Sequence, residues 1–158
     1  MSAAVARVLP RPGIPRVASR VDPRREPVLT IDLGAVARNT RLLAERAGAA
    51  ELMAVVKADG FGLGATDVAR TALSNGATRL GVTALHEALA LRAAGIDAPV
   101  LSWLNAVDAP FTTAVAADVD LAVPSRAHLD AVVAAVDSAG AGAAHRRARV
   151  HLHLDTGL

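Results

Sequence analysis

The sequence of 158 residues contains no cysteine and no tyrosine, and its other aromatic side chains are limited to one tryptophan and two phenylalanines. The absence of cysteine excludes disulfide bonds, a catalytic thiolate and cysteine-based zinc sites. The aromatic residues are too few, and too little mixed with basic residues, for a dedicated nucleic-acid surface. The sequence also lacks an uninterrupted apolar run of about 18 residues, so we expect no membrane-spanning segment.

The first 27 residues differ in composition from the rest of the chain. They carry six arginines against two acidic residues, and they hold five of the eight prolines. Because proline disfavours helix and removes a backbone donor, we expect residues 1–27 to form a disordered, dispensable arm. No apolar stretch precedes Pro10, which argues against a secretory signal, and we expect a cytoplasmic protein.

From residue 28 onward, short apolar runs alternate with longer segments of helical period rich in Ala, Leu and Arg. This alternation predicts strand-helix units joined by right-handed crossovers, in a doubly wound sheet or in a barrel. The predicted strands are residues 28–33, 52–57, 79–83, 99–103, 121–123 and 149–155. The predicted helices are residues 34–47, 65–74, 85–94, 107–116 and 126–138.

Lys57 is the only lysine of the chain, and it ends the apolar run LMAVVK. Parallel sheets and barrels place their active sites at the carboxyl ends of such strands. Partial loss of solvation there makes an amine available to form a Schiff base with a carbonyl compound. Lys57 is therefore the leading candidate for a catalytic residue, and a surface lysine at a strand end is the alternative.

Three glycines alternate in the segment that follows Lys57, at positions 60, 62 and 64. Their spacing is neither that of a Rossmann fingerprint nor that of a Walker loop. Glycine allows positive φ and a close approach of the backbone to a ligand. The segment 58–64 is therefore predicted to be a loop beside Lys57 that can contact a ligand.

His151, His153 and Asp155 alternate along the last predicted strand. Alternation places the three side chains on one face, and two imidazoles and a carboxylate could bind a metal ion. Side chains two residues apart on a strand are about 6.5 Å apart and would have to converge on the ion. A polar strand end without metal is the other interpretation.

The segment AVVKADGFGLGA (residues 54–65) resembles the cofactor-lysine motif of the alanine racemase family, usually written AVVKADGYGHGA. The segment VLTIDLGAVARN before it is similar to the opening strand and helix of that family. GATRLGVTALHEALALRAAGIDAPVLSWL and VHLHLDTGL are similar to later barrel units. The resemblance covers about residues 28–158.

This resemblance implies a pyridoxal 5'-phosphate enzyme, an isomerase that interconverts L- and D-alanine and supplies D-alanine for peptidoglycan. It implies an α/β fold in which residues 34–158 form part of a (β/α)8 TIM-type barrel, with about five of the eight strands. Residues 28–33 would be a strand of a second, carboxyl-terminal domain. The family's second base is a tyrosine of the partner subunit, so the complete protein would be a homodimer.

The same resemblance assigns roles to individual residues. Lys57 would hold the cofactor covalently and move the α-proton of alanine, and Phe61 and Trp103 would lie at the cofactor. Three positions depart from the family. Phe61 replaces a tyrosine whose hydroxyl contacts the cofactor phosphate, Leu63 replaces a common histidine, and His153 replaces a lysine that orients a substrate-binding arginine.

Two other functions are compatible with the residues. A barrel protein that binds pyridoxal phosphate without catalysis would need Lys57, and a metal-dependent barrel hydrolase would use His151, His153 and Asp155. A closed barrel has eight strands and about 250 residues. We therefore expect the 158-residue chain to be an amino-terminal portion. Expressed alone, it should have no racemase activity and should be poorly soluble or oligomerise irregularly.

Overall fold

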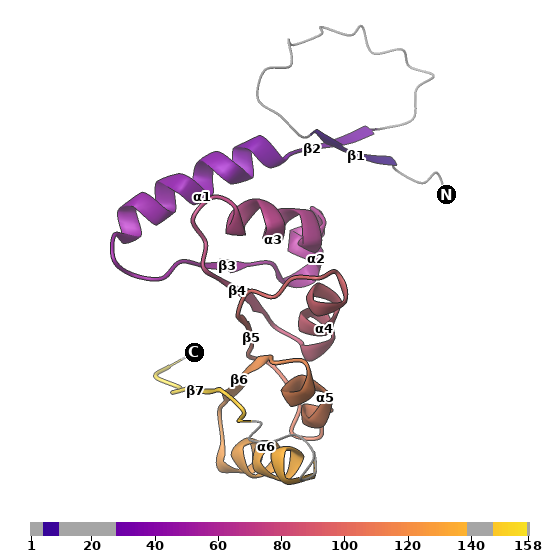
Figure 1. Cartoon of the computed structure of the whole chain (residues 1–158), viewed down its shortest axis with the longest axis vertical. Helices are drawn as coiled ribbons and strands as arrows, with labels where there is room; N and C mark the ends of the chain where they lie inside the picture. The colour runs from indigo at the N-terminus through magenta and orange to yellow at the C-terminus, as the bar shows by residue number, and fades with distance from the viewer. Residues whose placement is uncertain (1–4, 10–27, 139–146, 158) are drawn as a thin grey trace, which may run out of the picture.

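The computed structural model describes residues 5–9, 28–138 and 147–157. At its centre is a parallel sheet of five strands in the order β3-β4-β5-β6-β7, so that each strand pairs with the next one along the chain (Figure 1). An uninterrupted consecutive order is that of a barrel wall, since a doubly wound sheet reverses its strand order. The strands are β3 (Met53–Val55), β4 (Arg79–Val82), β5 (Val100–Ser102), β6 (Asp120–Val123) and β7 (Val150–Leu152).

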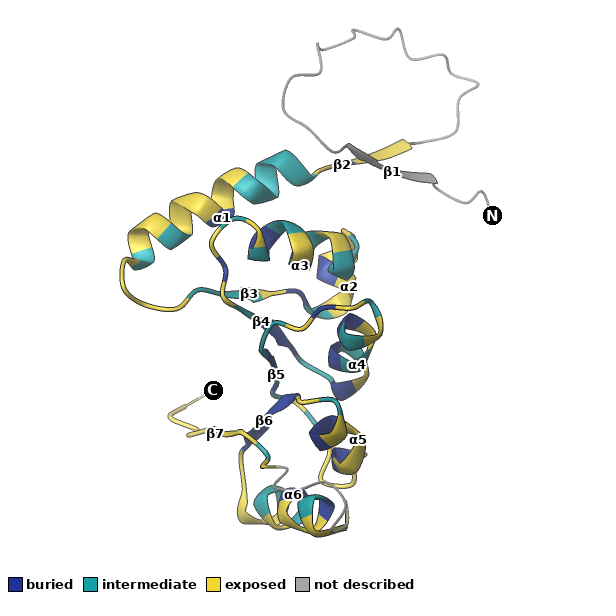
Figure 2. Ribbon diagram, viewed as in Figure 1, coloured by how far each residue is buried: buried dark blue, intermediate teal, exposed yellow. Residues whose placement is uncertain are grey.

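Helices follow the strands and cover one face of the sheet (Figure 1). They are α3 (Ala65–Leu73), α4 (Leu85–Ala93), α5 (Phe111–Ala116) and α6 (Arg126–Ser138). The core lies between this face and the helices, where buried residues concentrate (Figure 2). Its strand residues include Leu80, Val82, Val100 and Leu121, each 0% exposed. Full burial of such a side chain stabilises the fold by about 1.5–3 kcal/mol. Because these side chains point toward the helices, the alternate residues of each strand lie on the opposite, inner face of the sheet.

The expected partial α/β barrel with five strands is confirmed. Two element boundaries differ from the expectation by more than two residues. The helix expected from residue 107 begins at Phe111, because Pro110 is its N-cap and cannot donate to a preceding turn. The strand expected over residues 149–155 ends at Leu152.

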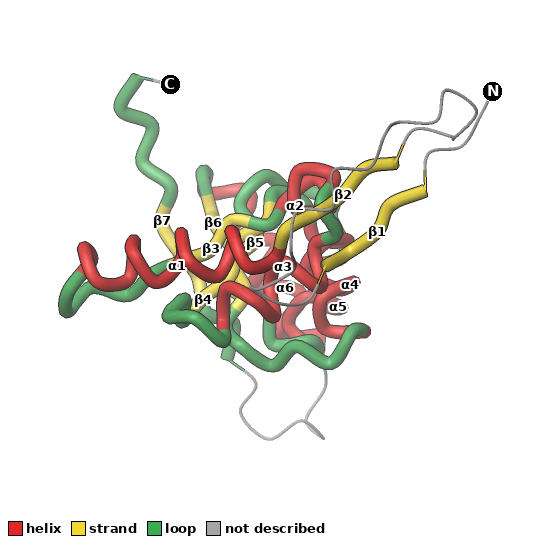
Figure 3. Tube along the Cα trace, turned by 90° about the horizontal axis from the view of Figure 1, so that it is seen from above, coloured by secondary structure: helices red, strands yellow, loops and turns green. Residues whose placement is uncertain are grey.

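The chain before the sheet forms β1 (Val5–Leu9), β2 (Val28–Asp32) and α1 (Leu33–Ala47). β1 pairs in parallel with β2, and the pair lies apart from the five-stranded sheet (Figure 3). The predicted disordered arm covers residues 1–27, whereas the structure describes residues 5–9 as the strand β1. The sequence VARVL precedes the first proline and contains two valines, which favour strands, so it can pair as a strand. The rest of the expected arm lies outside the described residues.

α1 begins where Asp32 caps it, since the Asp32 carboxylate accepts a hydrogen bond from the Ala35 amide at 3.1 Å. The membership of residues 28–33 in a second domain stays a prediction. Within the described ranges, no helix combines the length and the apolar character that a membrane crossing requires.

Candidate active site

Lys57 follows the last strand-like residue of β3. The Val56 amide donates a hydrogen bond to the Gly81 carbonyl at 2.9 Å, so the backbone keeps sheet register with β4 up to this point. The Val56 side chain is 1% exposed and belongs to the core against the helices. Lys57 therefore lies at the carboxyl end of β3, where the strand gives way to the next segment.

The segment Lys57–Gly62 (α2), called the lysine turn below, is where the structure differs from the predicted flexible loop. Four consecutive residues, Ala58 to Phe61, have φ between 53° and 62° and ψ between 36° and 50°, which is the left-handed helical region. Only Gly60 among them is a glycine. Each L-residue in this conformation costs about 1–2 kcal/mol, so other contacts must hold the turn.

Hydrogen bonds within the segment supply part of that stabilisation. The Gly60 amide donates to the Val56 carbonyl and the Gly64 amide to the Asp59 carbonyl, both at 2.9 Å. The Asp59 carboxylate accepts from the Ala65 amide at 2.8 Å, at the start of α3. The lysine turn is thereby joined to the amino end of α3.

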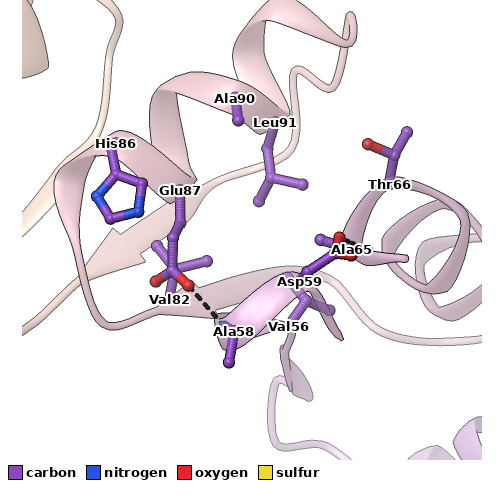
Figure 4. Close-up of a pocket in the computed structure, with 10 residues that line it drawn as sticks. All are labelled: Val56, Ala58, Asp59, Ala65, Thr66, Val82, His86, Glu87, Ala90 and Leu91. Atoms are coloured by element: carbon purple, nitrogen blue, oxygen red, sulfur yellow. Dashed lines mark hydrogen bonds between the residues drawn. The ribbon is translucent and has the colours of Figure 1, made fainter. Parts of the chain in front are cut away.

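Glu87, in the first turn of α4, joins the lysine turn to the next strand-helix unit. Its Oε1 accepts a hydrogen bond from the Ala58 amide at 2.6 Å (Figure 4). Its Oε2 accepts from the Thr83 amide at 3.1 Å and from the Thr83 hydroxyl and the Ala84 amide at 3.0 Å. Burial alone would raise the pKa of Glu87, but these hydrogen bonds outweigh it and lower the pKa below its ordinary value. Glu87 is therefore ionised near neutral pH.

Further hydrogen bonds connect the carboxyl ends of the later strands. The Leu85 amide donates to Oδ1 of Asn105 at 2.9 Å, and Asn105 is also bonded to the buried Ser102 hydroxyl. The Asn105 carbonyl is 3.1 Å from Nε2 of His128, beyond β6. Together with Glu87, these bonds link the loops after β3, β4, β5 and β6 at the edge where Lys57 lies.

Phe61 lies beside the lysine amine. Nζ of Lys57 is 5.0 Å from the centroid of the Phe61 ring, within the range of a cation–π contact. The Phe61 side chain is 63% exposed, so most of the ring remains accessible to another molecule.

Trp103 lies at the carboxyl end of β5, two strands away from β3. It lines a cavity of about 520 Å³ together with Leu101, Leu104, Ala122 and residues 151–154. Most residues that line the cavity are apolar, and the exceptions are His151 and His153. The structure thus places Trp103 near the carboxyl ends of the strands. Its contact with a cofactor stays a prediction.

Two of the three residues considered for a metal site, His151 and Asp155, have other partners. Nε2 of His151 is 3.5 Å from Oδ2 of Asp120. The Asp155 carboxylate accepts a hydrogen bond from the Gly157 amide, in the segment after β7. No group of three His, Cys, Asp or Glu side chains within the described ranges has an arrangement that could hold a metal ion. The metal-dependent hydrolase therefore lacks its ligand set.

Comparison with known proteins matches residues 31–158 to the model of the alanine racemase N-terminal domain. The alanine racemase of Mycobacterium ulcerans (strain Agy99) is 55% identical over 128 residues, which are 81% of this chain and 32% of that protein. That of Thermobifida fusca (strain YX) is 51% identical over 81% of this chain and 33% of that protein.

The solved structure of the alanine racemase from Streptomyces coelicolor A3(2) superposes with a TM-score of 0.75 and 45% identity. It covers 81% of this chain, and the chain covers 33% of it. The chain thus spans about a third of the length of the relatives it matches. Since the family match includes most of the chain, and the lysine turn within it, the protein belongs to the alanine racemase family through its N-terminal domain.

Proposed function

We propose that this chain forms the lysine-bearing part of an alanine racemase that depends on pyridoxal 5'-phosphate and interconverts L- and D-alanine. The observation that carries the proposal is the position of Lys57. It is the only side-chain amine of the sequence, and it lies at the carboxyl end of β3, in a turn held in a rare backbone conformation. A lysine that merely kept a surface in water would need no such turn.

The residues of the chain suit this cofactor in three ways. Lys57 offers a primary amine, the group that bonds covalently to the cofactor aldehyde. Phe61 offers an exposed aromatic ring 5.0 Å from that amine. The inner-face cavity at Trp103, of about 520 Å³, offers apolar walls of the kind that bind the ring of a small molecule.

In the proposed reaction, Lys57 has two tasks. Its amine would hold the cofactor, and when it is not bonded to the cofactor it would take or return the α-proton on one face of the substrate. The cofactor, when bound, supplies an electron sink that stabilises the negative charge left at Cα. Phe61, whose ring lies 5.0 Å from the amine, and Trp103, at the carboxyl end of β5, would contact the bound cofactor.

The remaining features of the function follow from the family. We propose that the complete protein acts as a homodimer in the cytoplasm and supplies D-alanine for peptidoglycan. The relatives support this proposal because they are named alanine racemases and match over 81% of the chain. Alanine is then the substrate, and neither nucleic acid nor membrane is a partner.

The assignment of Lys57 can be tested on the chain itself. After incubation with pyridoxal phosphate and reduction with borohydride, peptide mapping should find the label on Lys57. Lys57→Arg keeps the positive charge but offers no usable nucleophile at neutral pH, so it should abolish this label while leaving the fold unchanged. A label found only on the α-amino group would overturn the assignment.

The reaction needs its own test. The complete protein should form D-alanine from L-alanine in the presence of pyridoxal phosphate, and Lys57→Arg in the complete protein should not. Labelling of Lys57 without any D-alanine formation would instead favour the non-catalytic cofactor-binding protein.

A further inference from the structure

Glu87 divides its two carboxylate oxygens between two strand-helix units. Oε1 contacts the Ala58 amide of the lysine turn, while Oε2 contacts Thr83 and Ala84, at the end of β4 and the start of α4. The contact to Ala58 spans 29 residues of sequence and is the shorter one, at 2.6 Å. Figure 4 shows the Glu87 side chain extending from α4 toward Ala58, with a dashed line at their hydrogen bond. The carboxylate therefore connects the lysine turn to the better buried part of the sheet.

The position of Ala58 explains why this contact matters. Ala58 is the residue directly after Lys57, it is the first of the four left-handed residues, and it lacks the freedom of glycine. Its amide and the Lys57 carbonyl belong to the same rigid peptide unit. If this peptide rotated, the backbone of Lys57 would rotate with it, and the direction of the lysine side chain would change.

We propose that Glu87 is a positioning residue for Lys57. Its ionised carboxylate holds the Ala58 peptide in the left-handed conformation that directs the amine to the site where a pyridoxal phosphate aldehyde would bond. This inference rests on the proposed function, since it names what Lys57 is positioned for.

The geometry also explains why the residue must be a carboxylate. All of the groups around Oε1 and Oε2 are donors: three backbone amides and a hydroxyl. A glutamine has one acceptor oxygen and an NH2 group that only donates. The single acceptor oxygen can accept hydrogen bonds either from Thr83 and Ala84 or from Ala58, but not from both sides. Three of the four donors are on the side of Thr83 and Ala84. Glu87→Gln is therefore expected to keep the cap of α4 and to release Ala58.

The experiment measures two quantities in the full 158-residue chain. The first is hydrogen exchange of the Ala58 amide without cofactor. The second is the concentration of pyridoxal phosphate that half-saturates borohydride-trapped labelling of Lys57, with the α-amino group of the same molecule as internal reference. Glu87→Gln should speed Ala58 exchange and raise the half-saturating concentration, each about tenfold, as expected for loss of a hydrogen bond to a charged acceptor.

Two matched variants separate positioning from stability. Thr83→Val removes one donor from the other oxygen of the same carboxylate, and it should change both quantities less than about twofold. Glu45→Gln makes the same chemical change on an exposed part of α1 and should change neither. Glu87→Asp keeps the charge but is one methylene shorter, so it should act in the same direction as Glu87→Gln, and it serves if that variant does not fold.

The outcomes are distinct. Wild-type values for Ala58 exchange and Lys57 labelling in both Glu87 variants would overturn the proposal, and so would equal effects of Thr83→Val. If the wild-type chain takes up no label at Lys57, the proposed function fails. In that case, unchanged Ala58 exchange in Glu87→Gln would additionally show that Glu87 does not hold the turn.

Discussion

The indole ring of Trp103 lies over Gly81, the residue in the middle of the neighbouring strand β4. A Cβ atom at Gly81 would lie 2.6 Å from Cζ3 of Trp103 and 2.9 Å from Sδ of Met53. Any side chain at Gly81 would therefore displace the tryptophan ring or the methionine. The contact gives the inner face an aromatic surface beside β3, the strand that precedes Lys57. It is possible only because Gly81 has no side chain.

Gly81→Ala should lower the free energy of unfolding by about 1–3 kcal/mol, the usual cost of an extra methyl in a packed region. It should also change the fluorescence emission of Trp103, the only tryptophan of the chain. Gly95→Ala is the control, because Gly95 has a positive φ but nothing lies within 4 Å of its added Cβ. It should destabilise the chain without changing the emission. Unchanged emission in Gly81→Ala would show that the ring is not in contact with β4.

Arg92 ties together three chain segments at the other end of α4. Its guanidinium donates to the carbonyls of Ile96, Ala98, Ala117 and Asp118, at distances from 2.6 to 2.9 Å. Lysine has a single nitrogen and cannot reach acceptors on several sides. Arg92→Lys should therefore destabilise the fold by about 1.5–3 kcal/mol in urea unfolding.

The matched control for Arg92 is Arg126→Lys. Arg126 is exposed, and it forms an ion pair with Asp130 four residues along α6. Such pairs contribute little to stability, so this variant should leave the urea midpoint nearly unchanged. Equal effects of the two substitutions would contradict the role given to Arg92.

Most of the fold could be predicted because the signals are local. The runs around Leu80, Val100 and Leu121 are short and apolar, as strands covered by helices require, and glycines such as Gly48 end the helices. The predicted strand at residues 79–83 and helix at residues 126–138 agree closely with β4 and α6. The family resemblance was visible for the same reason, since the motif around Lys57 is continuous in the sequence.

The features that sequence reasoning missed depend on contacts between distant residues. The left-handed backbone at Ala58 is held by Glu87, which is 29 residues away. Nothing in the local sequence favours positive φ at an alanine, so a flexible loop was the natural expectation. The pairing of His151 with Asp120 likewise joins β7 to β6. The one available signal was Glu87 itself, three residues after the N-cap Ala84, which is the position of a capping-box glutamate.

Stability should decrease in acid, because two carboxylates have lowered pKa values in the folded chain. The hydrogen bond from Arg149 lowers the pKa of Asp118 despite its partial burial. Burial opposes the shift at Glu87, but its hydrogen bonds lower the pKa there as well. Below their ordinary pKa of about 4, the unfolded chain binds protons that the folded chain does not, so the stabilisation present at neutral pH is lost as the pH falls.

The measurement is the urea midpoint as a function of pH. The wild-type midpoint should fall as the pH drops below about 4, and the double variant Glu87→Gln, Asp118→Asn should show a smaller decrease from a lower starting value. Parallel curves for the two proteins would mean that these carboxylates do not cause the acid sensitivity.

Asp120 balances the positive charges of two arginines at the amino-terminal end of the sheet's inner face. It is 1% exposed, and its carboxylate is 2.6 Å from Nε of Arg149 and 3.4 Å from Nη1 of Arg79. Asp120→Asn leaves two guanidinium groups beside a neutral amide, so it should cost about 1.5–3 kcal/mol. Glu51→Gln, on the exposed partner of Arg79, should cost much less in the same thermal unfolding experiment. A larger effect at Glu51 would reverse this ranking of the two carboxylates.

Phe61 provides a test of how the chain departs from its family while keeping the lysine turn. Its ring is 63% exposed beside Lys57, so a hydroxyl added by Phe61→Tyr has room and can donate to the phosphate of a bound cofactor. One such charge-assisted hydrogen bond is worth about 1.5–3 kcal/mol, and half-saturation of Lys57 labelling should therefore need about tenfold less pyridoxal phosphate. Phe61→Leu keeps apolar volume but removes the aromatic face, so it should weaken labelling modestly, by the roughly 0.5–1 kcal/mol of an exposed cation–π contact. If Phe61→Tyr labels no better than the wild type while Phe61→Leu labels worse, the ring contacts the amine but does not face the phosphate, and the cofactor must lie against another side of the lysine turn.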